Sequence, residues 1–81
     1  MPVVFRYKGY RFFFYSNEGN PLESLHIHVR KGEALAKLWL SPEVTVAESY
    51  GMKSSELRVL MQVAEQNKKM IEEYWNEYFG L

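Results

Sequence analysis

The sequence contains no cysteine, no excess of either charge sign and no long run of apolar residues. Without cysteine there is no disulfide framework, no thiolate metal site and no cysteine nucleophile. No apolar stretch approaches the roughly 18 residues of a membrane span. Residues 1–4 lack the basic start and apolar stretch of a signal peptide. We therefore expect a cytoplasmic protein that does not associate with membranes.

The charges balance, with ten basic and ten acidic residues and a formal net charge of zero. Proteins dedicated to nucleic acids usually carry a basic excess, because neutralising phosphates supplies much of their affinity. The neutral total therefore disfavours a nucleic-acid partner, although it does not exclude one. Low net charge also favours self-association.

Apolar residues are plentiful, at 47% of the 81 residues, and aromatic residues make up 16%. This composition is far from that of a disordered chain. The length corresponds to one small domain over residues 1–81, which must bury its apolar side chains efficiently.

A first β-hairpin is predicted around Lys8-Gly9, since β-branched and aromatic residues flank a glycine turn on both sides. A two-residue turn pairs Tyr7 with Tyr10, and the same register gives the pairs Phe5–Phe12 and Val3–Phe14. One face of this hairpin is then wholly apolar. The other face carries Arg6, Arg11, Val4 and Phe13.

A second hairpin is predicted from residues 25–30 and 33–40 around Lys31-Gly32. The strict alternation of residues 25–30 is typical of a half-buried strand. By analogy with the first turn, the register gives the apolar pairs Val29–Ala34, Ile27–Ala36 and Leu25–Leu38. On the opposite face it gives His28–Leu35, His26–Lys37 and Ser24–Trp39.

The rest of the chain is predicted to form connections and a C-terminal helix. Residues 16–21 are dense in turn formers, and residues 44–47 form either a short edge strand or an irregular connection. A helix begins near Ser54, because apolar residues then recur at helical spacing, and Gly80 is placed to cap the end. The predicted apolar stripe of this helix comprises Leu57, Leu60, Met61, Ala64, Ile71, Trp75 and Tyr78. Asn67-Lys68 interrupts the apolar stripe, which indicates a kink or break. We therefore predict an α+β fold, in which an antiparallel sheet of two hairpins, with or without a fifth strand, packs against a long C-terminal helix.

Several segments together resemble the bacterial domain-of-unknown-function family 4160. The likeness is carried by residues 13–19, 26–29, 36–42, 51, 56–58 and 75–79, in order and spacing, and it covers nearly the whole chain. One departure is the stretch 21–25, where the family often has a Pro-Pro pair before its first histidine. The resemblance implies a small prokaryotic protein, often encoded beside another short protein in an arrangement like a toxin–antitoxin pair. It transfers no catalytic mechanism.

His26 and His28 are the sharpest candidates for chemistry. At positions i and i+2 of a strand they project from one face, about 7 Å apart along the strand. Two imidazoles so placed could share a metal ion, or act as an acid–base pair near neutral pH, with Glu18 and Lys37 as neighbours. The simpler interpretation is that both are surface residues on the solvent face of the sheet. No third ligand has diagnostic spacing, so neither a metal site nor another cofactor is predicted.

Trp39 is a candidate for partner binding. The predicted register points its side chain outward beside Leu35, and an exposed apolar patch with tryptophan is typical of an interaction surface. The alternative is that residues 44–46 or the end of the helix cover it.

Basic residues gather near the two predicted turns: Arg6, Lys8, Arg11, Arg30 and Lys31. With tyrosines nearby, they suggest a site for single-stranded nucleic acid. A solvated sheet face explains them more simply, and we favour that interpretation.

Two functions follow from these observations. The favoured one is a non-enzymatic interaction module, with a small protein partner or a second copy of itself, in a toxin–antitoxin-like pair. The alternative is a histidine-dependent enzyme or RNA-acting toxin that uses the face of His26 and His28.

Overall fold

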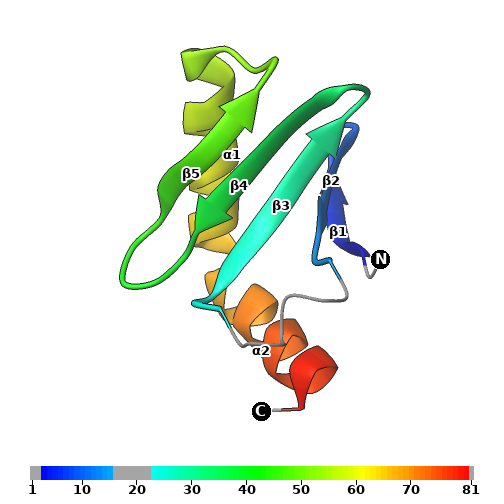
Figure 1. Cartoon of the computed structure of the whole chain (residues 1–81), viewed down its shortest axis with the longest axis vertical. Helices are drawn as coiled ribbons and strands as arrows, with labels where there is room; N and C mark the ends of the chain where they lie inside the picture. The colour runs from blue at the N-terminus through cyan, green and yellow to red at the C-terminus, as the bar shows by residue number, and fades with distance from the viewer. Residues whose placement is uncertain (1–2, 16–22, 81) are drawn as a thin grey trace.

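The computed structural model describes residues 3–15 and 23–80, and its elements lie in the order of five strands followed by two helices (Figure 1). The elements are β1 Val3–Tyr7, β2 Tyr10–Phe13, β3 His26–Lys31, β4 Ala34–Trp39, β5 Thr45–Tyr50, α1 Ser54–Gln66 and α2 Lys68–Phe79. The strands form one antiparallel sheet in the order β1-β2-β3-β4-β5. The predicted α+β class is confirmed. The predicted loop at residues 16–21 lies outside the described residues.

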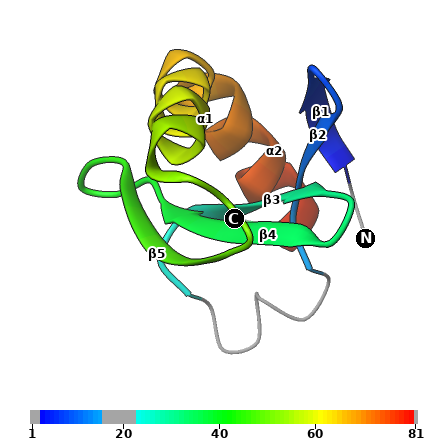
Figure 2. The same cartoon turned by 90° about the horizontal axis from the view of Figure 1, so that it is seen from above.

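Both helices lie on the same face of the sheet, here called the inner face, and the β1–β2 hairpin curves toward them (Figure 2). The core between the sheet and the helices is apolar. Its fully buried members include Phe12, Phe14, Ile27, Val29, Leu38, Leu40, Leu60, Ala64 and Ile71. Each large side chain buried here stabilises the fold by roughly 1.5–3 kcal/mol. In the described part of the chain, no helix has the length and apolarity that crossing a membrane requires.

The first hairpin turns at Lys8-Gly9 as predicted. Both turn residues have positive φ, 45° and 87°, which is the type I′ geometry that matches the twist of the strands. The pairs Tyr7–Tyr10 and Phe5–Phe12 are confirmed. The third predicted pair is wrong, because a β-bulge shifts the register and places Val3 opposite Phe13. The bulge also exposes Val3 and buries Val4, which the regular register had assigned to the outer face.

The second hairpin turns one residue later than predicted, at Gly32-Glu33. Gly32 has a φ of 60° at the first turn position, where a type II′ turn requires glycine. The predicted cross-strand pairs are therefore wrong, while the predicted faces are right, since each partner moves by two residues. His28 lies opposite Lys37, and His26 lies opposite Trp39.

β5 is a true strand and forms one edge of the sheet. It runs three residues further than the short strand expected at residues 44–47. Ala47 lies in a second bulge, between Glu48, which pairs with Lys37, and Val46, which pairs with Leu38. Its side chains are mostly exposed, and its one neighbour in the sheet is β4.

The expected long helix is two helices that meet at Asn67, where the sequence indicated a break. The Asn67 side chain donates to the Val63 carbonyl at 2.8 Å, and the backbone carbonyl of Asn67 accepts from the Ile71 N–H. One residue therefore ends α1 and starts α2. Gly80 ends α2 in the left-handed conformation, as predicted. The predicted apolar stripe is right at Leu60, Ala64, Ile71 and Trp75, but Tyr78 is 45% exposed.

A hydrogen bond ties β2 to the first turn of α1. The Tyr10 hydroxyl donates to the Glu56 carboxylate, which also accepts from the Lys53 backbone N–H at 3.1 Å. The bond from Tyr10, and then that from Lys53, lowers the pKa of Glu56 below its usual value. The same bond to Glu56 is the main cause of the raised pKa of Tyr10.

This contact predicts a pH-dependent contribution to stability. A carboxyl with a lowered folded-state pKa contributes stability that is present at neutral pH and is lost as the pH falls through that pKa. Tyr10→Phe should therefore lower the urea midpoint at pH 7, and the difference from wild type should vanish in acid. Tyr7→Phe is the matched control. A deficit that persists unchanged in acid would contradict the assignment.

Candidate functional site

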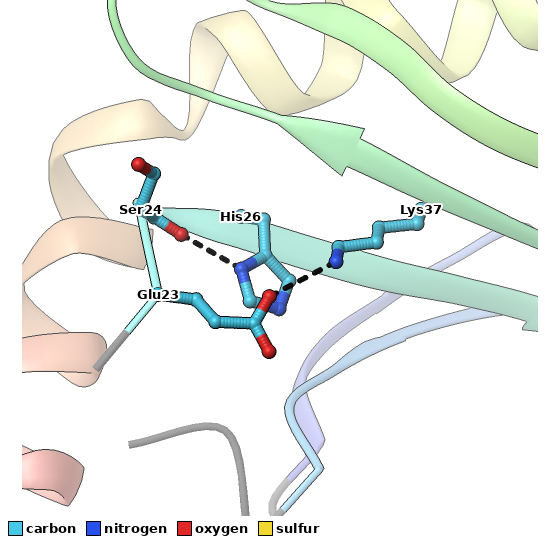
Figure 3. A network of polar contacts seen from close by, with 4 residues as sticks. All are labelled: Glu23, Ser24, His26 and Lys37. Carbon is cyan, nitrogen blue, oxygen red and sulfur yellow. Dashed lines mark hydrogen bonds and ion pairs between the residues drawn. The ribbon is translucent and has the colours of Figure 1, made fainter. Parts of the chain in front are cut away.

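The start of β3 carries His26, a polar side chain that is fully buried (Figure 3). Its Nδ1 lies 2.8 Å from the Ser24 carbonyl oxygen. A carbonyl oxygen only accepts, so Nδ1 carries the hydrogen and donates it. This local bond fixes the orientation of the ring as the chain enters the strand.

Aromatic rings enclose His26. The ring centroids of His28, Trp39 and Trp75 lie 5.2, 5.4 and 5.1 Å from its own. Trp75 comes from α2, so the helix reaches the start of β3 and closes over it. The expectation of a solvent-facing His26 is wrong, because this contact joins residues that are far apart in the sequence.

His28 is half-buried on the outer face, the sheet face opposite the helices. Its ring stacks against Phe13, with the centroids 5.6 Å apart, and meets the edge of Tyr15 at 4.5 Å. Phe13 is its direct partner across the β2–β3 pair. The structure thus places His28 in an aromatic group on the outer face, with more access to solvent than His26.

Lys37 is the partner of His28 on the other side, and it makes two contacts. Its Nζ lies 3.1 Å from an oxygen of Glu23 (Figure 3). It also lies 4.4 Å from the centroid of the Trp39 ring. A partly exposed ion pair contributes only about 0–1 kcal/mol. Its main consequence is positional, since it holds the ammonium group over the indole.

Trp39 is half-buried between Lys37 and His26. The exposed apolar patch expected around it is therefore not formed by Trp39 itself. The strongly exposed aromatic residue on this face is Tyr50 of β5, at 73%. It lies across the β4–β5 pair from Leu35.

A pocket of about 210 Å³ opens between these groups, here called the β5 pocket. Its lining comes from three strands and from Tyr15: Tyr15, His28, Leu35, Ala36, Lys37, Glu48, Ser49 and Tyr50. It therefore combines an imidazole, an ammonium group and a carboxylate with two tyrosine rings. His26 is not part of the lining.

Among the residues that the structure describes, the side chains that could ligate a metal do not form a metal centre. No group of three or more histidine, aspartate or glutamate side chains gathers there. The ammonium of Lys37 beside His28 also opposes a bound cation.

The sequence-predicted site residues fall into two places. His26, His28, Lys37 and Trp39 are brought together at the start of β3, and Leu35 lies in the β5 pocket with His28 and Lys37. Glu18 lies outside the described residues. Sequence reasoning missed Glu23, Glu48 and Tyr50, because the β4–β5 register that aligns two of them carried no clear signal.

Comparison with known proteins identifies the family. Residues 9–76 match the family model described as "Domain of unknown function (DUF4160)", and the chain belongs to this family. The match confirms the family resemblance inferred from the sequence, and its description assigns no activity. The searches of curated proteins and of solved structures each found no match.

Proposed function

We propose that this chain is a protein-interaction module that binds a second small protein along β5. The observation that carries the proposal is an exposed edge strand with a pocket beside it. β5 pairs on one side with β4, and five of its six residues are exposed. A partner strand can add to such an edge through backbone hydrogen bonds, while a neighbouring pocket receives one of its side chains.

Tyr50 and Leu35 support the same site. Tyr50 is the most exposed of the large hydrophobic residues described, and tyrosine is enriched among residues that dominate binding energy. Leu35 lies directly opposite it, at the wall of the β5 pocket. A small partner protein, as in a toxin–antitoxin-like pair, is the class that the family resemblance suggests, and a second copy of the chain is the alternative occupant.

Strand addition can be tested at the bulge. Ala47→Pro removes one backbone N–H of β5 where the register with β4 is already interrupted, and proline is tolerated at bulges and edges. We expect this change to weaken a purified complex about tenfold or more, whereas Ala47→Thr retains the N–H and should retain binding. The partner would first be identified by mass spectrometry after co-purification in stoichiometric amount, and affinities then measured by calorimetry.

A second pair of variants tests the side-chain contact. Tyr50→Ala should weaken the complex, and Tyr74→Ala, which removes a 47% exposed tyrosine from α2, should not. Equal affinity for wild type, Ala47→Pro and Tyr50→Ala would reject the β5 site. A chain that forms a stable homodimer in light scattering, and does not form it in Ala47→Pro, would identify the partner as a second copy.

The position of His28 favours a second candidate function, a histidine-dependent reaction such as RNA cleavage. His28 lines the β5 pocket together with Lys37 and the carboxylate of Glu48. An imidazole in such a group can transfer protons near neutral pH. His28→Ala should then abolish cleavage or toxicity while the protein stays folded, and unchanged activity would end this candidate.

A further inference from the structure

The register of the sheet aligns three arginines in one row across the outer face. Arg6 of β1 pairs with Arg11 of β2, and Arg11 pairs with Arg30 of β3. From this row we propose that the β1–β3 part of the outer face binds the backbone of a single-stranded nucleic acid. The proposal goes beyond the β5 site. It shares Tyr15 and His28 with the lining of the β5 pocket, but it rests on the arginine row, which is not part of that lining.

Directly opposed like charges are unfavourable in an antiparallel sheet. Here two such pairs follow one another, so the row weakens the fold that contains it. In residues 3–15 and 23–80, no carboxylate forms an ion pair with Arg6, Arg11 or Arg30. Within the same residues, the row makes one polar contact, from Arg30 Nε to the Gly32 carbonyl oxygen, at 3.0 Å inside its own hairpin. An anionic ligand would offset the repulsion that the described residues leave uncompensated.

The charges of the chain are segregated although their sum is zero. Residues 3–13 and 26–31 contain five basic side chains and no acidic one: Arg6, Lys8, Arg11, Arg30 and Lys31. The helices over residues 54–79 contain five glutamates against three basic side chains. The β1–β3 part of the sheet therefore carries a local excess of positive charge, although the net charge of the whole chain is zero. Such a basic patch attracts phosphates.

The shape of the row indicates a polyanion. Neighbouring strands lie about 4.8 Å apart, so the backbones that carry the three arginines span roughly 10 Å. A single compact anion would have to draw the three like-charged guanidinium groups together, whereas successive phosphates of one strand can meet them along the line. Arginine also suits phosphate because its planar group donates two parallel hydrogen bonds.

Aromatic groups in the adjoining row favour a single strand over a duplex. Next to the arginines, the same face carries His28 and Tyr15, whose rings lie 4.5 Å apart, over the buried Phe13. Unpaired bases stack on such rings, while the bases of a duplex are already stacked on each other. The face thus offers charges for a backbone and rings for bases side by side.

The proposal is tested by fluorescence anisotropy with a labelled single-stranded RNA of mixed sequence, about 20 nucleotides long. At about 50 mM salt we expect binding in the micromolar range, with the affinity falling as salt rises. The triple variant Arg6→Gln/Arg11→Gln/Arg30→Gln should bind about tenfold more weakly or worse. Its salt slope should also be smaller in magnitude, by about 0.7 for each phosphate that the variant no longer neutralises.

A matched control removes the same charge from the helices: Arg58→Gln/Lys68→Gln/Lys69→Gln. This variant should bind RNA as wild type does, and the arginine triple variant should be at least as stable as wild type, because repulsion is relieved. Tyr15→Leu keeps an apolar side chain but no π face, and should weaken binding by about fivefold or more.

Three outcomes would overturn the proposal. They are no RNA binding at about 50 mM salt, equal binding by the two triple variants, or tighter binding to a duplex or to phosphatidylserine vesicles than to the single strand. Ala47→Pro leaves the arginine row intact. If neither Ala47→Pro nor Tyr50→Ala weakened partner binding while the wild-type chain bound RNA, only the β5 interaction proposal would be rejected.

Discussion

Replacing Trp75 with alanine is expected to lower the free energy of unfolding by about 3–5 kcal/mol. The indole is 3% exposed and contacts three rings, with centroid distances of 5.2 Å to Phe14, 5.1 Å to His26 and 4.5 Å to Phe79. Truncation removes its packing against the core and leaves a cavity where α2 meets the sheet. A domain of 81 residues has a total stability of roughly 4–12 kcal/mol, so this variant should be close to unfolding at room temperature.

The neighbouring Tyr74 provides the matched control. It lies on the same helix but is 47% exposed, so Tyr74→Ala should cost less than about 0.5 kcal/mol. Urea titrations followed by far-UV circular dichroism measure both changes without depending on the removed indole. Similar costs at the two positions would mean that α2 does not pack as described.

Trp75 also determines whether solvent reaches His26. In wild type the imidazole is fully buried, so a reagent such as diethyl pyrocarbonate should modify it far more slowly than the half-buried His28. In Trp75→Phe, which keeps a ring but has a smaller side chain, modification of His26 should accelerate while the fold persists. Peptide mass mapping separates the two histidines.

Most of the fold was predictable because the two hairpins and the helices had local signals, whereas β5 did not. Glycine turns between β-formers indicated the hairpins, strict alternation indicated the faces of β3, and Asn67 interrupted the helical stripe where the two helices meet. These signals act over a few residues, so one sequence is enough to detect them.

The register was less predictable because glycine can occupy either position of a two-residue turn. Lys31-Gly32 looked like Lys8-Gly9, but Gly32 is the first turn residue and not the second. The displacement preserves the faces and changes every partner. The cross-strand partner of His28 is Lys37 and not the predicted Leu35, so the chemistry of the site differs from the prediction.

Pairing between the two hairpins carried no local signal at all. Nothing near Arg11 or Arg30 in the sequence indicates that they lie side by side, and the bulge in β1 was equally hidden. The basic residues were therefore visible as a collection near the turns but not as a row. For the same reason the burial of His26 could not be predicted, since it depends on Trp75.

Replacing His26 and His28 separately should show that His26 contributes much more to stability than the more accessible His28. His26→Ala removes a fully buried ring and its bond to the Ser24 carbonyl, and should cost about 2–4 kcal/mol of unfolding free energy. His28→Ala removes a half-buried ring and should cost about 1 kcal/mol. The measurement is the urea midpoint and slope of each variant at neutral pH.

His26→Asn refines the test, because its amide nitrogen can still donate to Ser24 while the aromatic ring is absent. Its stability should fall between those of wild type and His26→Ala. If His26→Ala were as stable as His28→Ala, the enclosure of His26 by Trp39 and Trp75 would be wrong. With stabilities known, RNA binding and cleavage can be compared at temperatures where each variant is folded. Activity that is abolished in His28→Ala and retained in His26→Asn would then place the chemistry in the β5 pocket, because of the two histidines only His28 lines it.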